Sequence, residues 1–222
     1  ISRRLKRSWP RLCPGWDPWW LLMRRSVMRF VRSAVVTIAA LAVSLPAVVA
    51  AQGAHADEHR KLDAMAIGDS VVLGAKSQLK SAGVKEVDAE VSRQASVGPG
   101  LVRERGAALP THVVVHLGTN GTYTLKMCRR LVRSAGPTRT VYLVTVKVPR
   151  AWEDVNNLMM RRCAEKFRND RVVLVDWNSV ASKNPEFLYA DGYHLRPEGA
   201  KAFARMVRKA ISTPRAPYFI LL

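Results

Sequence analysis

Short apolar segments rich in β-branched residues alternate with longer segments of helical spacing from residue 62 to residue 211. The segment 112–117, HVVVHL, is apolar on both faces, as a strand buried within a parallel sheet is. The predicted strands are 62–67, 87–91, 112–117, 141–146 and 172–175, and the predicted helices are 70–81, 123–134, 153–169 and 197–211. This alternation favours one α/β domain in which helices cover both faces of a parallel sheet.

Composition narrows the class of protein further. The 222 residues are 48% hydrophobic and 24% charged, which excludes a disordered polyelectrolyte and a polytopic membrane protein. The net charge is +19, and residues 57–222 keep +11, from 27 Lys and Arg against 16 Asp and Glu. These basic residues are scattered, without a basic run or interleaved aromatic residues. We therefore expect attraction to anionic cell-envelope polymers and no binding to nucleic acid.

The first 56 residues have the pattern of an export signal. Residues 33–51 carry no charge, four arginines precede them, and residues 54–56, Ala-His-Ala, offer a cleavage site. An uncleaved membrane anchor is the alternative, because about 18 apolar residues can span a bilayer. Residues 1–22 fit neither pattern, and we expect them to be an extension upstream of the true start. The prediction is a signal peptide at 23–56, followed by an extracytoplasmic, monomeric domain at 57–222.

Two cysteines, Cys128 and Cys163, lie in the expected mature domain. Outside the reducing cytosol such a pair is a candidate disulfide, whereas two buried free thiols are the alternative. No spacing of His, Cys, Asp and Glu resembles a metal site, and the chain has no phosphate loop or dinucleotide fingerprint. We therefore expect neither a metal ion nor another cofactor.

Three polar clusters lie where a parallel sheet collects its active-site residues, at the carboxyl ends of strands. The cluster 68–70, Gly-Asp-Ser, opens a helix, and N–H groups at a helix start can stabilise an oxyanion. The cluster 118–121, Gly-Thr-Asn-Gly, offers an amide as a second donor. In the cluster 191–194, Asp-Gly-Tyr-His, the carboxylate can orient the imidazole toward a serine hydroxyl. Each cluster alone could be an ordinary turn or helix cap, but together they predict nucleophilic catalysis.

In these clusters the chain resembles the SGNH (GDSL-type) hydrolase superfamily, over essentially all of residues 62–211. The resemblance implies a three-layer α/β/α, flavodoxin-like fold with a five-stranded parallel sheet in the order 2-1-3-4-5. It also implies that Ser70 is the nucleophile, that His194 is the base and that Asp191 orients His194. The oxyanion hole would comprise the N–H groups of Ser70 and Ser92 and the side chain of Asn120. Family members usually have glycine where Ser92 stands.

Four further segments, IGDSVVLGA, SRQ, VVHLGTNG and VPRAWEDVNN, are similar to the extracytoplasmic SGNH domains of enzymes that O-acetylate peptidoglycan. This similarity implies hydrolysis or transfer of acetyl esters on a cell-envelope glycan or a small ester. The residues expected to contact the substrate are Asp69, Gly118, Arg150, Trp152 and Asn156. Trp152 has two interpretations, stacking on a sugar ring or packing against the last helix. In the implied strand order, the helices that carry Cys128 and Cys163 are neighbours on one face, which permits the disulfide. A non-catalytic envelope-binding domain of the same fold is the alternative function.

Overall fold

The computed structural model describes residues 61–168 and 171–214. The predicted upstream extension, signal peptide and cleavage site therefore lie outside the described residues. Among the helices in the described part of the chain, none combines the length and the apolar character needed to cross a membrane.

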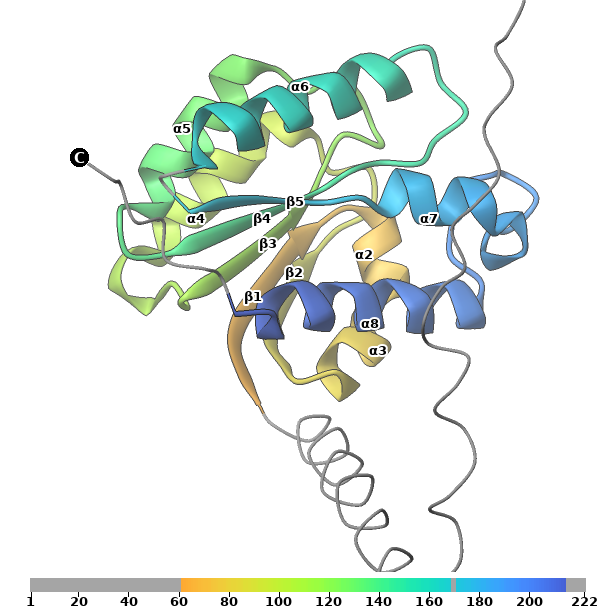
Figure 1. The fold of residues 1–222 in the computed structure, drawn as a ribbon, viewed down its shortest axis with the longest axis horizontal. Coiled ribbons are helices and arrows are strands. Elements are labelled where there is room, and N and C mark those ends of the chain that lie inside the picture. The colour runs from red at the N-terminus through yellow and green to blue at the C-terminus, as the bar shows by residue number, and fades with distance from the viewer. Residues whose placement is uncertain (1–60, 169–170, 215–222) are drawn as a thin grey trace, which may run out of the picture. The chain divides into compact units, whose positions relative to one another are not determined.

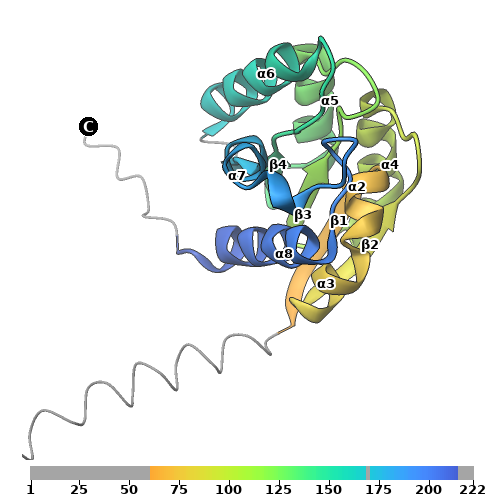
Figure 2. The same cartoon turned by 90° about the vertical axis from the view of Figure 1, so that its right-hand side faces the viewer.

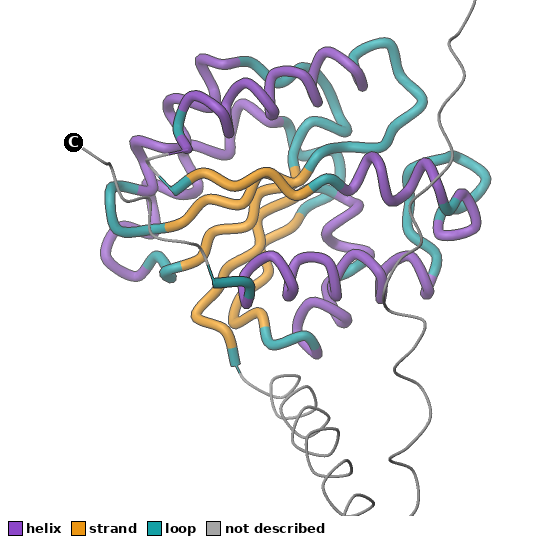
Figure 3. The backbone as a smooth tube through the Cα atoms, viewed as in Figure 1, coloured by secondary structure: helices purple, strands orange, loops and turns teal. Residues whose placement is uncertain are grey.

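One sheet of five parallel strands forms the centre of the fold, with the strands side by side as Figure 3 shows. Their order is β2-β1-β3-β4-β5, so the order implied by the family resemblance is confirmed. The strands are β1 Leu62–Gly68, β2 Val84–Ala89, β3 His112–His116, β4 Thr140–Val144 and β5 Val172–Val175. The predicted position of the second strand, 87–91, is wrong: β2 begins three residues earlier and ends two residues earlier. Pairing with β1 ends at Ala89, and the Val91 side chain beyond it is 63% exposed.

Seven α-helices are found among the described residues, and they range from five to sixteen residues in length. They are α2 Ser70–Gly74, α3 Lys76–Ser81, α4 Gly98–Arg105, α5 Leu125–Ala135, α6 Glu153–Lys166, α7 Trp177–Lys183 and α8 Pro197–Ser212. Three 3-10 turns accompany them: η2 Ala95–Val97, η3 Gly106–Ala108 and η5 Pro185–Phe187. The predicted helix 70–81 is two short helices that meet at Ala75. The sequence pattern missed α4 and α7, which have only eight and seven residues.

The two faces of the sheet bury separate sets of side chains, because successive strand residues point in opposite directions. On β1, Met65 and Ile67 pack under α4, α5 and α6, whereas Ala64 and Ala66 face α2, α3, α7 and α8. Figures 1 and 2 show these two helical layers on either side of the strands, with α5 beside α6 and α3 beside α8. The second layer is centred on the fully buried rings of Trp177 and Phe203, which meet edge to face with centroids 5.2 Å apart. The three-layer α/β/α architecture is thus confirmed.

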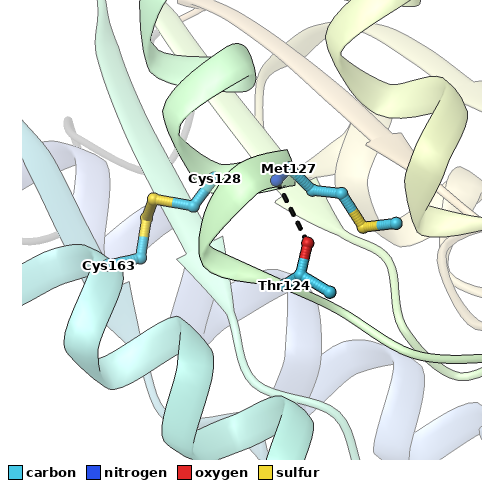
Figure 4. The surroundings of a disulfide bond; sticks show 4 residues. All are labelled: Thr124, Met127, Cys128 and Cys163. Atoms are coloured by element: carbon cyan, nitrogen blue, oxygen red, sulfur yellow. Dashed lines mark hydrogen bonds between the residues drawn. A yellow bond between two sulfur atoms is a disulfide. The ribbon is translucent and has the colours of Figure 1, made fainter.

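A disulfide joins Cys128 of α5 to Cys163 of α6, two neighbouring helices of the same layer (Figure 4). Both cysteines are fully buried, and 35 residues separate them in the sequence. The pairing expected for an exported domain is therefore present, and the alternative of two free thiols is wrong for this structure. Near the bridge, Thr124 caps α5, its Oγ1 accepting a hydrogen bond from the N–H of Met127 at 3.3 Å.

Candidate active site

Ser70 is placed by a sharp connection between β1 and α2. Gly68 ends the strand, Asp69 is the N-cap residue, and Ser70 is the first residue of the helix. A Cβ atom at Gly68 would lie 2.2 Å from Cγ2 of Val72, so only glycine lets the helix turn back this closely. The N–H of Ser70 lies in the first helical turn, where backbone donors have no acceptor within the helix. The connection therefore presents the hydroxyl beside an N–H group that can bind an anion.

A chain of hydrogen bonds links Ser70 to His194 and Asp191, which lie more than 120 residues away in the sequence. The Oγ atom of Ser70 lies 3.0 Å from Nε2 of His194, and Nδ1 of His194 lies 2.8 Å from Oδ2 of Asp191. The other oxygen of Asp191 accepts hydrogen bonds from the N–H groups of Tyr193 and His194, at 3.1 and 3.0 Å. The structure thus brings together the three residues expected to be catalytic.

The environment of Asp191 favours its ionised form. Burial raises the pKa of this carboxyl, but the hydrogen bond from the His194 ring and those from the N–H groups of Tyr193 and His194 lower it more. The net effect is a pKa below the ordinary value of 3.8. An ionised carboxylate accepts the proton on Nδ1, which leaves Nε2 of a neutral imidazole free to accept the serine hydroxyl proton.

A cavity of about 280 Å³ lies beside these residues. Its lining residues come from four loops and are Ser92, Gln94, Thr119, Asn120, Val148, Arg150, Trp152 and Tyr193. The ring of Tyr193 connects the cavity to the catalytic side, since its centroid lies 4.1 Å from that of His194. Ser92 has a left-handed backbone with φ of 62°, a conformation that glycine adopts more easily. The amide of Asn120 lies 3.5 Å from the carbonyl oxygen of Arg93, so the loops carrying Ser92 and Asn120 adjoin.

Two of the predicted substrate residues, Arg150 and Trp152, line this cavity. Arg150 is exposed, and Trp152 is half-buried against the apolar layer under α4, α5 and α6. The interpretation in which Trp152 packs against the last helix is therefore wrong, because α8 lies on the other side of the sheet. Among the described residues, no group of three or more His, Cys, Asp or Glu side chains is arranged to hold a metal ion.

The other three predicted substrate residues, Asp69, Gly118 and Asn156, are buried and do not line the cavity. Asp69 is fully buried, accepts a hydrogen bond from the N–H of Val71 at 3.1 Å, and lies 3.6 Å from Nδ1 of His116. Burial raises the pKa of Asp69, but the neighbouring His116 ring and the hydrogen bond from the N–H of Val71 are among the influences that together lower it more. We correct the prediction for Asp69: it caps α2 beneath Ser70 and is closed to substrate.

Asn156 holds the loop that carries Asn120. Its Oδ1 accepts a hydrogen bond from the N–H of Tyr123 at 2.7 Å, and its Nδ2 donates to the carbonyl oxygens of Gly118 and Gly121 at 2.9 and 2.7 Å. Gly118 has φ of 130°, and a Cβ atom added there would lie 3.2 Å from Nδ2 of Asn156. The loop and the amide therefore fit closely. Both are therefore corrected from substrate residues to positioning residues.

The sequence analysis missed two further positioning residues on α6, Asn157 and Glu153. Asn157 pairs with both the N–H and the carbonyl of Val146, at 2.8 and 2.9 Å. Glu153 accepts from the N–H of Val148 at 2.5 Å and from Nζ of Lys147 at 3.0 Å. These contacts fix the base of the loop that carries Arg150 and Trp152. The available signal was the pair of adjacent amides in EDVNN, because a side-chain amide can satisfy both a backbone donor and a backbone acceptor.

Replacing Asn156 with alanine should destabilise the protein. The change leaves a buried N–H and two carbonyl groups without partners, which costs about 3 kcal/mol and lowers Tm by roughly 10 °C. Hydrogen exchange at the Tyr123 amide should accelerate as well, since this amide loses its acceptor. Asn184→Ala is the matched control, because that amide makes a single hydrogen bond at the end of α7. Unchanged exchange at Tyr123 would show that Asn156 does not hold the loop.

Comparison with known proteins shows what the chain is similar to in sequence and in fold. No protein-family model matches the chain. The chain is 36% identical over 154 residues to YrhL of Bacillus subtilis, named as a candidate peptidoglycan O-acetyltransferase, a match covering 68% of the chain and 24% of YrhL. It is 33% identical over 161 residues to the O-acetyltransferase OatA of Staphylococcus aureus, covering 71% of the chain and 26% of OatA.

The fold matches the C-terminal catalytic domain of OatA from Streptococcus pneumoniae, solved with a methylsulfonyl adduct. The TM-score is 0.56 at 24% identity, and the match covers 68% of this chain and 92% of that domain. The resemblance of the chain to the SGNH (GDSL-type) hydrolases, expected from its sequence, is thus confirmed at the level of the fold. The three clusters that carry the resemblance lie at comparable places in the fold. The Gly-Asp-Ser cluster lies at the end of β1, the Gly-Thr-Asn cluster follows β3, and the Asp-Gly-Tyr-His cluster precedes α8. The chain spans about a quarter of the length of the curated relatives that it matches.

Proposed function

We propose that this protein is a serine esterase or O-acyltransferase that acts on acetyl esters of a cell-envelope glycan. The observation that carries the proposal is the hydrogen-bond chain from Ser70 Oγ through His194 to Asp191, at 3.0 and 2.8 Å. A serine hydroxyl is a weak nucleophile until an adjacent base removes its proton. The arrangement supplies that base together with the carboxylate that orients it.

In the first half of the reaction, Oγ of Ser70 attacks the acetyl carbonyl carbon while Nε2 of His194 takes the hydroxyl proton. The carbonyl oxygen becomes an oxyanion, for which the N–H groups of Ser70 and Ser92 and the amide of Asn120 are the proposed donors. Collapse of the tetrahedral intermediate breaks the bond to the leaving alcohol, which receives the proton from His194. The products are an acetylated Ser70 and a free hydroxyl compound.

In the second half, an acceptor hydroxyl attacks the carbonyl carbon of the acetyl-enzyme while Nε2 of His194 takes its proton. The bond to Oγ of Ser70 then breaks, and Oγ recovers the proton from His194. Water as the acceptor gives acetate and an esterase, whereas a sugar hydroxyl gives an acetylated glycan and a transferase. Both outcomes use the same three residues, and they differ in what the cavity binds. Arg150 and Trp152 line that cavity, and a half-buried indole offers a flat surface on which a sugar ring can stack.

The glycan in this proposal is supported by the names of the relatives, which are O-acetyltransferases and include a peptidoglycan O-acetyltransferase. The excess of basic residues in 57–222 adds attraction to an anionic envelope. An extracytoplasmic location agrees with the signal pattern in residues 23–56 and with a buried disulfide, since disulfides persist in oxidising compartments.

The test is product analysis with the full chain and p-nitrophenyl acetate, with and without a chitooligosaccharide acceptor. We expect acetate release in water and acetylated sugar, detected by mass spectrometry, when the acceptor is present. Acetate alone at saturating acceptor would restrict the proposal to an esterase. If folded protein releases no acetate and forms no acetylated sugar, the chain is a non-catalytic domain and the proposal is wrong.

A further inference from the structure

A second and larger cavity, of about 740 Å³, lies between α4 and α5. We call it the α4–α5 groove; the residues that matter here are Val97, Leu101, Arg103, Glu104, Arg130 and Arg133. Three of these carry a guanidinium and one carries a carboxylate, so the groove has an excess of positive charge. Figure 2 shows the two helices in the same layer, beside each other.

The three groove arginines have no acidic partner among the residues that the structure describes. Arg105, on the same short helix as Arg103, contrasts with them because it forms ion pairs with Glu86 and Asp88. Arg103, Arg130 and Arg133 are all exposed. Their guanidinium groups can therefore form charged pairs with an external anion, for which their planar fork of donors suits carboxylates and phosphates.

The groove begins next to the proposed active site. Gln94 lines the cavity of about 280 Å³ beside Ser70 and His194, which we call the catalytic cavity. Ser96 and Val97, in the turn η2 that follows, line the groove. At about 2 Å per residue in a 3-10 turn, roughly 6 Å of backbone separates Gln94 from Val97. One extended molecule can therefore occupy both cavities.

We propose that the α4–α5 groove binds the negatively charged groups of a glycan strand whose acylated sugar lies in the catalytic cavity. The inference rests on the proposed function, because that function supplies the glycan. Carboxylates and phosphates on the strand share the chemistry that three guanidinium groups recognise. None of the side chains lining the groove is aromatic, which disfavours single-stranded nucleic acid as the occupant, since its bases stack on aromatic platforms.

The test is a comparison of two triple variants with equal net charge in a binding assay with the full chain. The groove variant is Arg103→Gln/Arg130→Gln/Arg133→Gln. The control is Arg162→Gln/Lys183→Gln/Arg205→Gln, at exposed positions on α6, α7 and α8 that line neither cavity. The probes are a hyaluronan hexasaccharide, which carries carboxylates, a phosphorylated mannopentaose and the neutral chitohexaose.

We expect the groove variant to bind at least one charged probe about tenfold more weakly than unsubstituted protein, and the control variant to change Kd less than threefold. Loss confined to hyaluronan identifies carboxylates, and loss confined to the mannopentaose identifies phosphates. Binding by unsubstituted protein should also weaken as NaCl rises from about 50 to about 300 mM. Equal effects of both variants, equal loss for chitohexaose, or no binding of either charged probe would overturn the proposal.

A single-stranded thymidine dodecamer that binds more tightly than either charged glycan, with the same arginine dependence, would also overturn the proposal in favour of nucleic acid. Should the triple variant fail to fold, Arg133→Gln alone is compared with Arg205→Gln. The assay involves no turnover, so a failure of the proposed function would be seen separately, as the absence of acetate release.

Discussion

Replacing Ser70 with alanine should reduce kcat/KM for p-nitrophenyl acetate by at least about a thousandfold, because no other group in the arrangement can carry the acetyl group. The fold should persist. Ser70 is partly exposed, and the cap of α2 comes from the side chain of Asp69 and is untouched by the change. We therefore expect Tm to remain within about 2 °C of the unsubstituted value.

Covalent labelling provides an independent measurement of the same role. A fluorophosphonate should label the unsubstituted protein at Ser70 and leave the Ser70→Ala variant unlabelled. Ser182→Ala is the matched control, since Ser182 is an exposed serine on α7 and does not line the catalytic cavity. Retention of more than about a tenth of the activity by folded Ser70→Ala would contradict the assignment of the nucleophile.

Removing the disulfide should produce the largest loss of stability. Closing a loop of 35 residues lowers the entropy of the unfolded chain, which stabilises the folded protein by about 4 kcal/mol. For a domain of this size, a loss of about 4 kcal/mol lowers Tm by roughly 13 °C. The measurement is thermal unfolding of oxidised protein, of reduced protein, and of the variant Cys128→Ala/Cys163→Ala.

Two comparisons separate the bridge from other effects. The alanine variant also loses buried side-chain atoms, so its Tm should be at or below that of the reduced unsubstituted protein. Cys13, the third cysteine of the full chain, lies outside the domain. The Cys13→Ala variant retains Cys128 and Cys163 and should respond to reductant as the unsubstituted protein does. Identical melting with and without reductant would contradict a stabilising role for the bridge.

The strands of the sheet, and the polar clusters at their carboxyl ends, could be predicted because their sequence signals are local and strong. A run such as residues 112–117 is apolar on both faces, which only a strand covered on both sides requires. The order of the strands came from the family resemblance, because periodicity does not say which strands pair. Helix α7 was missed for a physical reason: seven residues are too few for a repeating pattern to stand out.

Burial of polar side chains is the part of the site that the sequence does not reveal. Asp69 and Asn156 lie in the same motifs as Ser70 and Trp152, yet both are fully buried and form hydrogen bonds with backbone groups. A polar residue type serves equally well to satisfy a buried backbone group and to contact a substrate. To distinguish buried polar residues from residues that contact substrate, one must know which side of each loop faces solvent. Tertiary packing determines that.

The loop of residues 145–152 has a fixed base and an open tip. At its base, Asn157 and Glu153 hold the backbone of Val146 and Val148, whereas Arg150, near its tip, is exposed. None of these contacts passes through Ser70, His194 or Asp191. In the proposed function, substitutions of the exposed Arg150 side chain can therefore alter which acceptor enters the cavity while the reactive groups keep their distances. In that function, acceptor preference can therefore change during evolution through the loop of residues 145–152, without a change in the residues that carry out the reaction.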